Sequence, residues 1–68
     1  MRNPIYSELV VVGTYPGELS ASLAKTALEA AGIESMIRNY ALQYPAGLGF
    51  ELLVTADDAT QARQILSD

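Results

Sequence analysis

The sequence contains no cysteine and no histidine among its 68 residues. Without cysteine there are no disulfides, no thiolate ligands for metals and no thiol nucleophile. The lack of histidine removes the commonest general base and a common ligand of transition metals. We therefore expect no catalytic residue, no metal site and no cofactor. The fold must depend on apolar packing in a chain near the lower size limit of an independent domain.

Basic residues and long apolar runs are also scarce. Only Arg2, Lys25, Arg38 and Arg63 are basic, against eight acidic residues, and the net charge is −4. Four scattered cations form no stripe that neutralises phosphates, so we expect no nucleic-acid binding. No apolar run approaches the roughly 20 residues of a membrane span, and the N-terminus lacks the pattern of a signal peptide. We expect a cytoplasmic protein that does not enter a membrane.

Apolar periodicity predicts five elements. The Val-rich run near the start is typical of a strand buried on both faces or nearly so. An Ala- and Leu-rich amphipathic segment follows and ends at Gly32. Asp57 is a typical N-cap residue for the last helix. The predicted boundaries are a strand at 8–15, a helix at 17–31, a strand at 33–39, a loop at 40–49, a strand at 50–56 and a helix at 58–67.

This order predicts an α+β two-layer sandwich in a single domain, 1–68. Two helices on one face of an antiparallel three-stranded sheet give most of a ferredoxin-like βαββαβ unit, with the final strand absent. The first strand then keeps a free, uncharged edge, which favours pairing with another chain. We predict a homodimer through that edge or through the open face of the sheet. Alternatively, residues 2–7 cover the edge, where Pro4 would be tolerated.

The connection between the second and third strands is unusually apolar. Residues 39–49 read NYALQYPAGLG and carry no charge. One interpretation is a lid, in which Leu42, Leu48 and one tyrosine cover an open end of the sandwich. The other is a docking loop for a protein partner, because aromatic residues are preferred anchors of interfaces. The candidate contact residues are Arg38, Tyr40, Leu42, Tyr44 and Pro45.

Two packing motifs resemble a known bacterial family. These are ASLAKTALEAAGI at 21–33 and GFELLVTADDATQARQIL at 49–66. They resemble the domain called putative prokaryotic signal transducing protein, whose fold is related to that of the nitrogen-regulatory P-II proteins. The resemblance covers about residues 8 to 67. It implies a small regulatory module, and in P-II proteins the connection between the second and third strands reaches partners. No motif here matches the nucleotide-binding residues of those proteins.

Residues 10–33, from the first strand to the glycine and isoleucine at the end of the first helix, are similar to the opening of ACT domains, which sense amino acids. Pro16, Gly17 and Leu19 fit the Pro-Gly-x-Leu turn of that family, while Tyr15 replaces its usual aspartate or asparagine. This similarity implies an amino-acid site at a subunit interface, where N–H groups of the helix N-terminus bind the carboxylate. The candidate ligand-binding residues in this alternative are Tyr15, Pro16, Gly17 and Leu19.

The functional prediction is a non-catalytic binding or regulatory module. The adjacent acids Asp57 and Asp58 are explained by helix capping, and Ser20 and Ser22 have no histidine to activate them. The alternatives are the amino-acid sensor and a structural subunit that serves oligomerisation.

Overall fold

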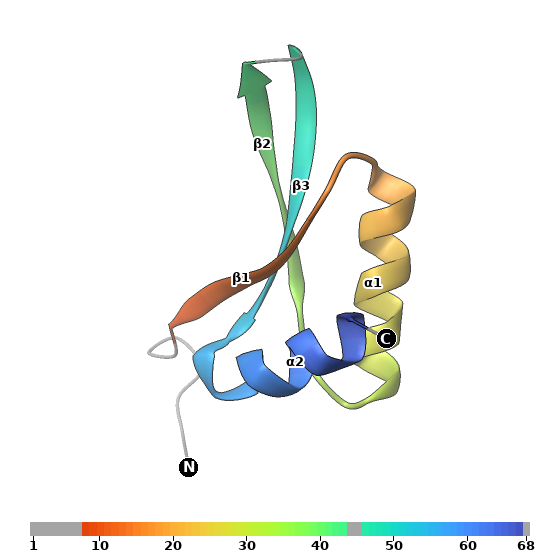
Figure 1. Ribbon diagram of the computed structural model, residues 1–68, viewed down its shortest axis with the longest axis vertical. Helices are drawn as coiled ribbons and strands as arrows, with labels where there is room; N and C mark the ends of the chain where they lie inside the picture. Colours follow the sequence, from red (N-terminus) through yellow and green to blue (C-terminus); the bar gives the residue numbers. More distant parts are fainter. Residues whose placement is uncertain (1–7, 44–45, 68) are drawn as a thin grey trace.

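The structure is a computed structural model that describes residues 8–43 and 46–67 (Figure 1). The elements are β1 (Leu9–Tyr15), α1 (Glu18–Ala30), β2 (Met36–Gln43), β3 (Ala46–Thr55), a short 3-10 helix η2 (Ala56–Asp58) and α2 (Ala59–Leu66). The strand order is β1-β3-β2, and both neighbouring pairs are antiparallel. Both helices cover one face of this sheet. The predicted α+β, ferredoxin-like βαββα fold is confirmed.

The core lies between β3 and the two helices. Leu28 of α1 packs against Leu52 and Val54 of β3, and these three side chains are fully or almost fully buried. Ala21 and Ala62 are also completely buried. Because alanine is small, it allows both helices to approach the sheet closely. The buried apolar set is Ala21, Leu28, Ile33, Leu52, Leu53, Val54, Ala59 and Ala62.

The C-terminal end of α1 is closed by a Schellman motif. Gly32 has φ +82°, its N–H donates to the Glu29 carbonyl (2.9 Å), and the Ile33 N–H donates to the Leu28 carbonyl (2.9 Å). Ile33 and Leu28 also belong to the same buried cluster, which supplies the hydrophobic contact typical of this motif. The predicted helix end at Gly32 is therefore confirmed.

Replacing Gly32 is expected to destabilise the domain least with asparagine, more with alanine and most with valine. A left-handed residue with a Cβ is disfavoured by roughly 1–2 kcal/mol, asparagine tolerates it best, and a β-branched residue tolerates it least. No atom lies within 4 Å of a Cβ added at Gly32, so steric overlap does not contribute. Urea unfolding of the three variants measures this order. Equal stability of Gly32→Ala and the wild type would contradict it.

The predicted strand at 33–39 begins later in the structure. β2 starts at Met36, which pairs with Leu53. The Ile33 N–H is already bonded to α1, and the Ser35 carbonyl accepts a hydrogen bond from Lys25 Nζ (3.1 Å). Because these backbone groups have partners outside the sheet, residues 33–35 connect the helix to the strand without joining the ladder.

The predicted loop at 40–49 is wrong. β2 runs to Gln43 and β3 starts at Ala46, so strands occupy nearly all of that segment. Its glycines, residues that often interrupt a strand, permit the ladder here. Gly47, opposite Leu42, has φ +152°, a conformation that residues with a Cβ rarely adopt. Gly49 lies opposite Tyr40 and makes room for its ring.

Two smaller expectations are corrected as well. β1 is not buried on both faces: Leu9 and Thr14 are exposed and the other five residues are only half-buried, because the strand lies at the edge of the sheet. The last helix does not begin with Asp57 as its N-cap. Residues Ala56–Asp58 form η2, and α2 starts at Ala59 after Asp58.

Candidate functional site on the open sheet face

The β2–β3 hairpin extends past the rest of the fold. β1 pairs with β3 only as far as Tyr15 opposite Phe50, whereas β2 continues to pair with β3 up to Gln43 opposite Ala46. Residues 40–43 and 46–49 therefore form a two-stranded projection, which we call the hairpin arm. Figure 1 shows it rising beyond β1 and the start of α1. The outer edges of both of its strands have no partner strand among the described residues.

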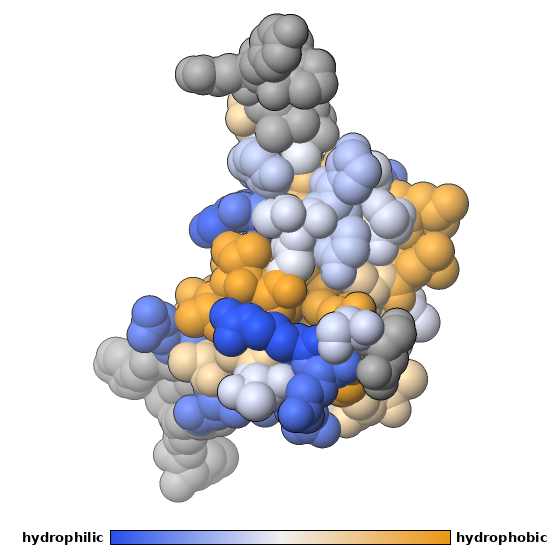
Figure 2. All heavy atoms as spheres, in the orientation of Figure 1, coloured by the Kyte–Doolittle hydropathy of each residue, from blue (hydrophilic) through white to orange (hydrophobic). Residues whose placement is uncertain are grey.

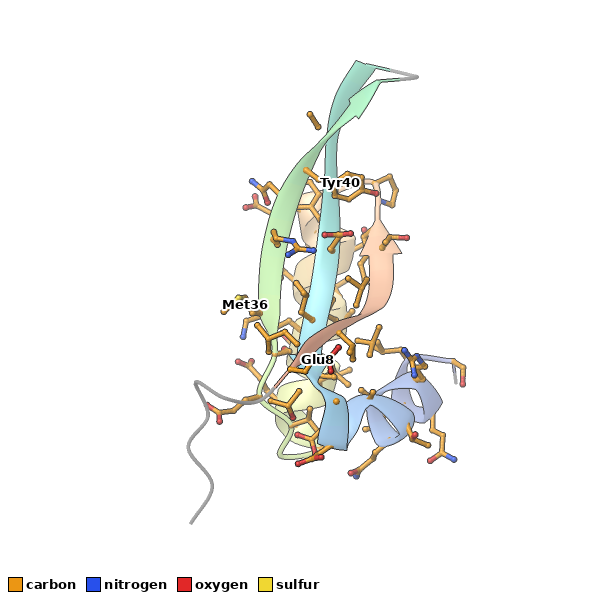
Figure 3. All side chains as sticks on the ribbon, turned by 90° about the vertical axis from the view of Figure 1, so that its left-hand side faces the viewer. Glu8, Met36 and Tyr40 are labelled. Carbon is orange, nitrogen blue, oxygen red and sulfur yellow. The ribbon has the colours of Figure 1, made fainter. Side chains whose placement is uncertain are left out.

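Tyr40 lies across the base of the arm on the face of the sheet away from the helices. Its ring occupies the space where a Cβ of Gly49 would be, with Oη and Cε1 both 2.7 Å from that position. Gly49 is consequently buried and Tyr40 is half-buried. Figure 3 shows the Tyr40 ring directed from β2 toward β3. An aromatic ring over a cross-strand glycine covers exposed backbone and stabilises the pairing.

An ion pair forms the next row of the same face. Arg38 donates from Nε (2.9 Å) and Nη2 (2.7 Å) to Oε1 of Glu51, its partner across the strands. The Arg38 side chain is 58% exposed and that of Glu51 is 21% exposed. Solvent screening keeps such a pair to about 0.2–1 kcal/mol. The Arg38–Glu51 ion pair lies next to the aromatic ring of Tyr40 on this face of the sheet.

An apolar row lies below the ion pair. Val11, Leu53 and Met36 face one another across β1, β3 and β2. Leu53 is 4% exposed, whereas Met36 is 53% exposed at the outer strand, and Leu9 is 47% exposed near the start of β1. We call the surface formed by Val11, Met36, Arg38, Tyr40, Glu51 and Leu53 the open sheet face.

The structure brings two of the predicted docking residues together. Arg38 and Tyr40 occupy successive positions on the open sheet face, two residues apart on β2. Tyr40 is directed away from the core between the sheet and the helices, so it does not act as the predicted lid over that core. Leu42 lies on β2 within the arm. Tyr44 and Pro45, like residues 2–7 with Pro4, lie outside the described residues.

The residues of the alternative ligand site lie at the end of β1 and the start of α1. Tyr15 ends β1, and its ring covers Gly13 on the helix side of the sheet. Gly17 is the N-cap of α1 and provides no side-chain cap, while Ser20 Oγ donates to the Gly17 carbonyl (3.0 Å). Pro16 is exposed, and Leu19 is 74% exposed. The four residues lie within 15–19; Pro16 and Leu19 are exposed, whereas Tyr15 and Gly17 are half-buried.

Two exposed apolar residues, Leu23 and Met36, were not identified from the sequence. Leu23 is 63% exposed and shares the outer side of α1 with Leu19. Figure 2 shows hydrophobic side chains at the right-hand margin, over the N-terminal half of α1. At 100° per residue, Leu19 and Leu23 fall opposite the buried Ala21 and Leu28. Apolar residues on two opposite sides of a helix cannot all face one core. This spacing is visible in the sequence and indicates that Leu19 and Leu23 are exposed.

A hollow at the C-terminal end of α1 is a weaker candidate for a binding site than the open sheet face. It is lined by Lys25, Glu29, Gly32, Ile33, Glu34 and Ser35. The Lys25 ammonium group is already bonded to Glu29 (3.0 Å) and to the Ser35 carbonyl (3.1 Å). Its charge is therefore balanced within the hollow.

Comparison with protein families gives one match. The model of the family described as putative prokaryotic signal transducing protein matches residues 13–68. The chain belongs to this family. The match includes both packing motifs that suggested it and begins at the bulged part of β1. No curated protein and no solved structure matches the chain. Among the described residues, no helix combines the length and the apolar character needed to cross a membrane.

Proposed function

We propose that this family member is a non-catalytic, cytoplasmic regulatory module that docks a protein partner through the hairpin arm and the adjoining open sheet face. The observation that carries the proposal is the position of Tyr40. It is an aromatic side chain held by Gly49 on the face away from the core, next to the exposed Arg38. Tyrosine and arginine are the residue types most enriched in the energetic centres of protein interfaces.

The hairpin arm extends the proposed docking surface beyond the rest of the fold. The arm is uncharged throughout and stands clear of the helices. A two-stranded hairpin is only marginally stable in water by itself, and contact with a partner would stabilise it. From the sequence, the proposed contact surface also includes Leu42, Tyr44 and Pro45. The family name, which denotes signal transduction, is consistent with a module that acts by binding.

Two further functions follow from specific observations. An amino-acid sensor at Tyr15, Pro16, Gly17 and Leu19 is favoured by the start of α1, which has no side-chain cap on its N–H groups. A structural subunit is favoured by the outer edge of β1, which has no partner strand in the part of the chain that the structure describes. With each of the three functions, we propose that the chain forms a homodimer.

The docking proposal is tested by comparing proteins retained on immobilised wild-type chain with those retained on the Tyr40→Ala variant. A partner that docks as proposed is retained by the wild type and lost with Tyr40→Ala, and it then binds in a purified two-component assay. If the same proteins bind both forms, the arm is not the docking surface. A saturable rise in melting temperature with an amino acid, abolished by Gly17→Ala together with Leu19→Ala, would favour the sensor instead.

A further inference from the structure

The sheet ends abruptly at β1. One side of β1 is paired with β3, and no strand among residues 8–43 and 46–67 pairs with its other side. The strand Leu9–Tyr15 contains no charged residue and no proline, the devices that commonly protect an edge from pairing. Its one irregularity is a bulge between Val11 and Gly13. The bulge restricts which strands fit against this edge without blocking it.

The helix layer ends at the same place. Val10 and Val12 of β1 and Ile65 and Leu66 of α2 pack against the core but stay partly exposed, in contrast to the fully buried Leu28 and Leu52. Figure 2 shows hydrophobic side chains along β1, bordered by hydrophilic ones over α2. An apolar area with a polar rim is typical of an interaction surface. Within the described residues, both layers of the sandwich are therefore open at the β1 side.

We propose that this opening is closed by a second copy of the chain, with β1 pairing antiparallel to β1 of its partner about a two-fold axis. The inference rests on the proposed homodimer and names its interface. A free strand from another protein would extend only the sheet. A second copy presents the same two-layer cross-section, so it extends the sheet from three to six strands and brings its own α2 alongside.

The charges are compatible with self-association at this edge. Each copy carries −4, so two copies repel where acidic residues meet, but the β1 strands bring no charge to the contact. α2 contacts β1, so the two-fold axis places the two α2 helices side by side and antiparallel. Arg63 of one copy then approaches the acidic N-terminal end of α2 in the other, where Asp58 is the N-cap.

The test is sedimentation velocity of the full chain over a range of concentrations. The edge variant Leu9→Lys with Thr14→Lys places a cation near each end of β1, at two exposed positions on the side of the strand away from the helices. In an antiparallel pair these lysines oppose each other at both ends, and we expect dimer association to weaken about tenfold or more. Ser22→Lys with Thr26→Lys is the matched control, because it adds the same charge at exposed positions of α1. Met36→Lys tests the open sheet face in the same way.

Loss of the dimer in the edge variant alone supports the inference. Loss with Met36→Lys, alone or together with loss in the edge variant, would overturn it and would place the interface on the open sheet face, leaving the homodimer itself intact. A wild-type chain that stays monomeric at every concentration would overturn both the edge interface and the homodimer. Circular dichroism of each variant establishes that it is folded before its mass is interpreted.

Discussion

Replacing Leu28 by alanine is expected to lower the free energy of unfolding by about 2–5 kcal/mol, a large part of the chain's total stability. Leu28 is completely buried and contacts the cluster shared by α1, β3 and α2. Removing a buried leucine side chain costs about 2–5 kcal/mol, because apolar burial is lost and a cavity remains. A chain of 68 residues has a total stability of roughly 3–10 kcal/mol. The substitution therefore removes much of the available stability.

Leu23→Ala is the matched control for this prediction. It makes the same change in the same helix, with the same effect on helix propensity, at a side chain that is 63% exposed. We expect its free energy of unfolding to lie within about 0.5 kcal/mol of the wild type. Urea titrations at one fixed protein concentration compare the two, since association would otherwise change the apparent stability. Equal destabilisation by both substitutions would mean that the outer side of α1 is buried in solution.

Truncation of Tyr40 to alanine is expected to weaken partner binding by about 30-fold or more. Loss of an aromatic anchor at the centre of an interface costs at least about 2 kcal/mol, which corresponds to that factor. Isothermal titration with the purified partner measures the change. Tyr40→Phe keeps the ring over Gly49 and should retain most of the affinity if the contact is apolar.

Asn39→Ala controls for damage to the arm. Asn39 precedes Tyr40 on β2 and is exposed on the opposite face of the sheet, where it pairs with Phe50. We expect its effect on affinity to be less than about threefold. If Asn39→Ala and Tyr40→Ala weaken binding equally, the loss reflects a disturbed hairpin, and a docking role for the Tyr40 ring is excluded.

The sequence was sufficient for those parts of the fold that depend on local chemistry. Gly32 indicated the end of α1 because a left-handed C-terminal residue is a local requirement, and the structure satisfies it. Phe50, Leu52 and Val54 alternate with Glu51 and Thr55 in the sequence, and strand period alone then predicts that Leu52 and Val54 share the buried face, as they do. The motifs around these residues also indicated the family.

Features that depend on pairing across the sheet were not predictable in the same way. Taken alone, Gly49 indicates a break in a strand. Its position opposite Tyr40, where it leaves space for the Tyr40 ring, is decided by the register of β2 against β3. Ile33 and Ser35 alternate like strand residues, but their backbone groups bond to α1 and to Lys25. For the candidate site, the sequence identified Arg38 and Tyr40 but not the ion-pair partner Glu51, because the register of β2 against β3 decides that contact.

Docking through the open sheet face and the arm can be tested by mapping amide chemical shifts of the labelled domain as purified partner is added. We expect the perturbed amides to cluster at Met36, Arg38, Tyr40, Gly49 and Glu51, with those of Ser22 and Thr26 on the outer side of α1 unchanged. Perturbations confined to α1, with the Tyr40 and Gly49 amides unaffected, would contradict it.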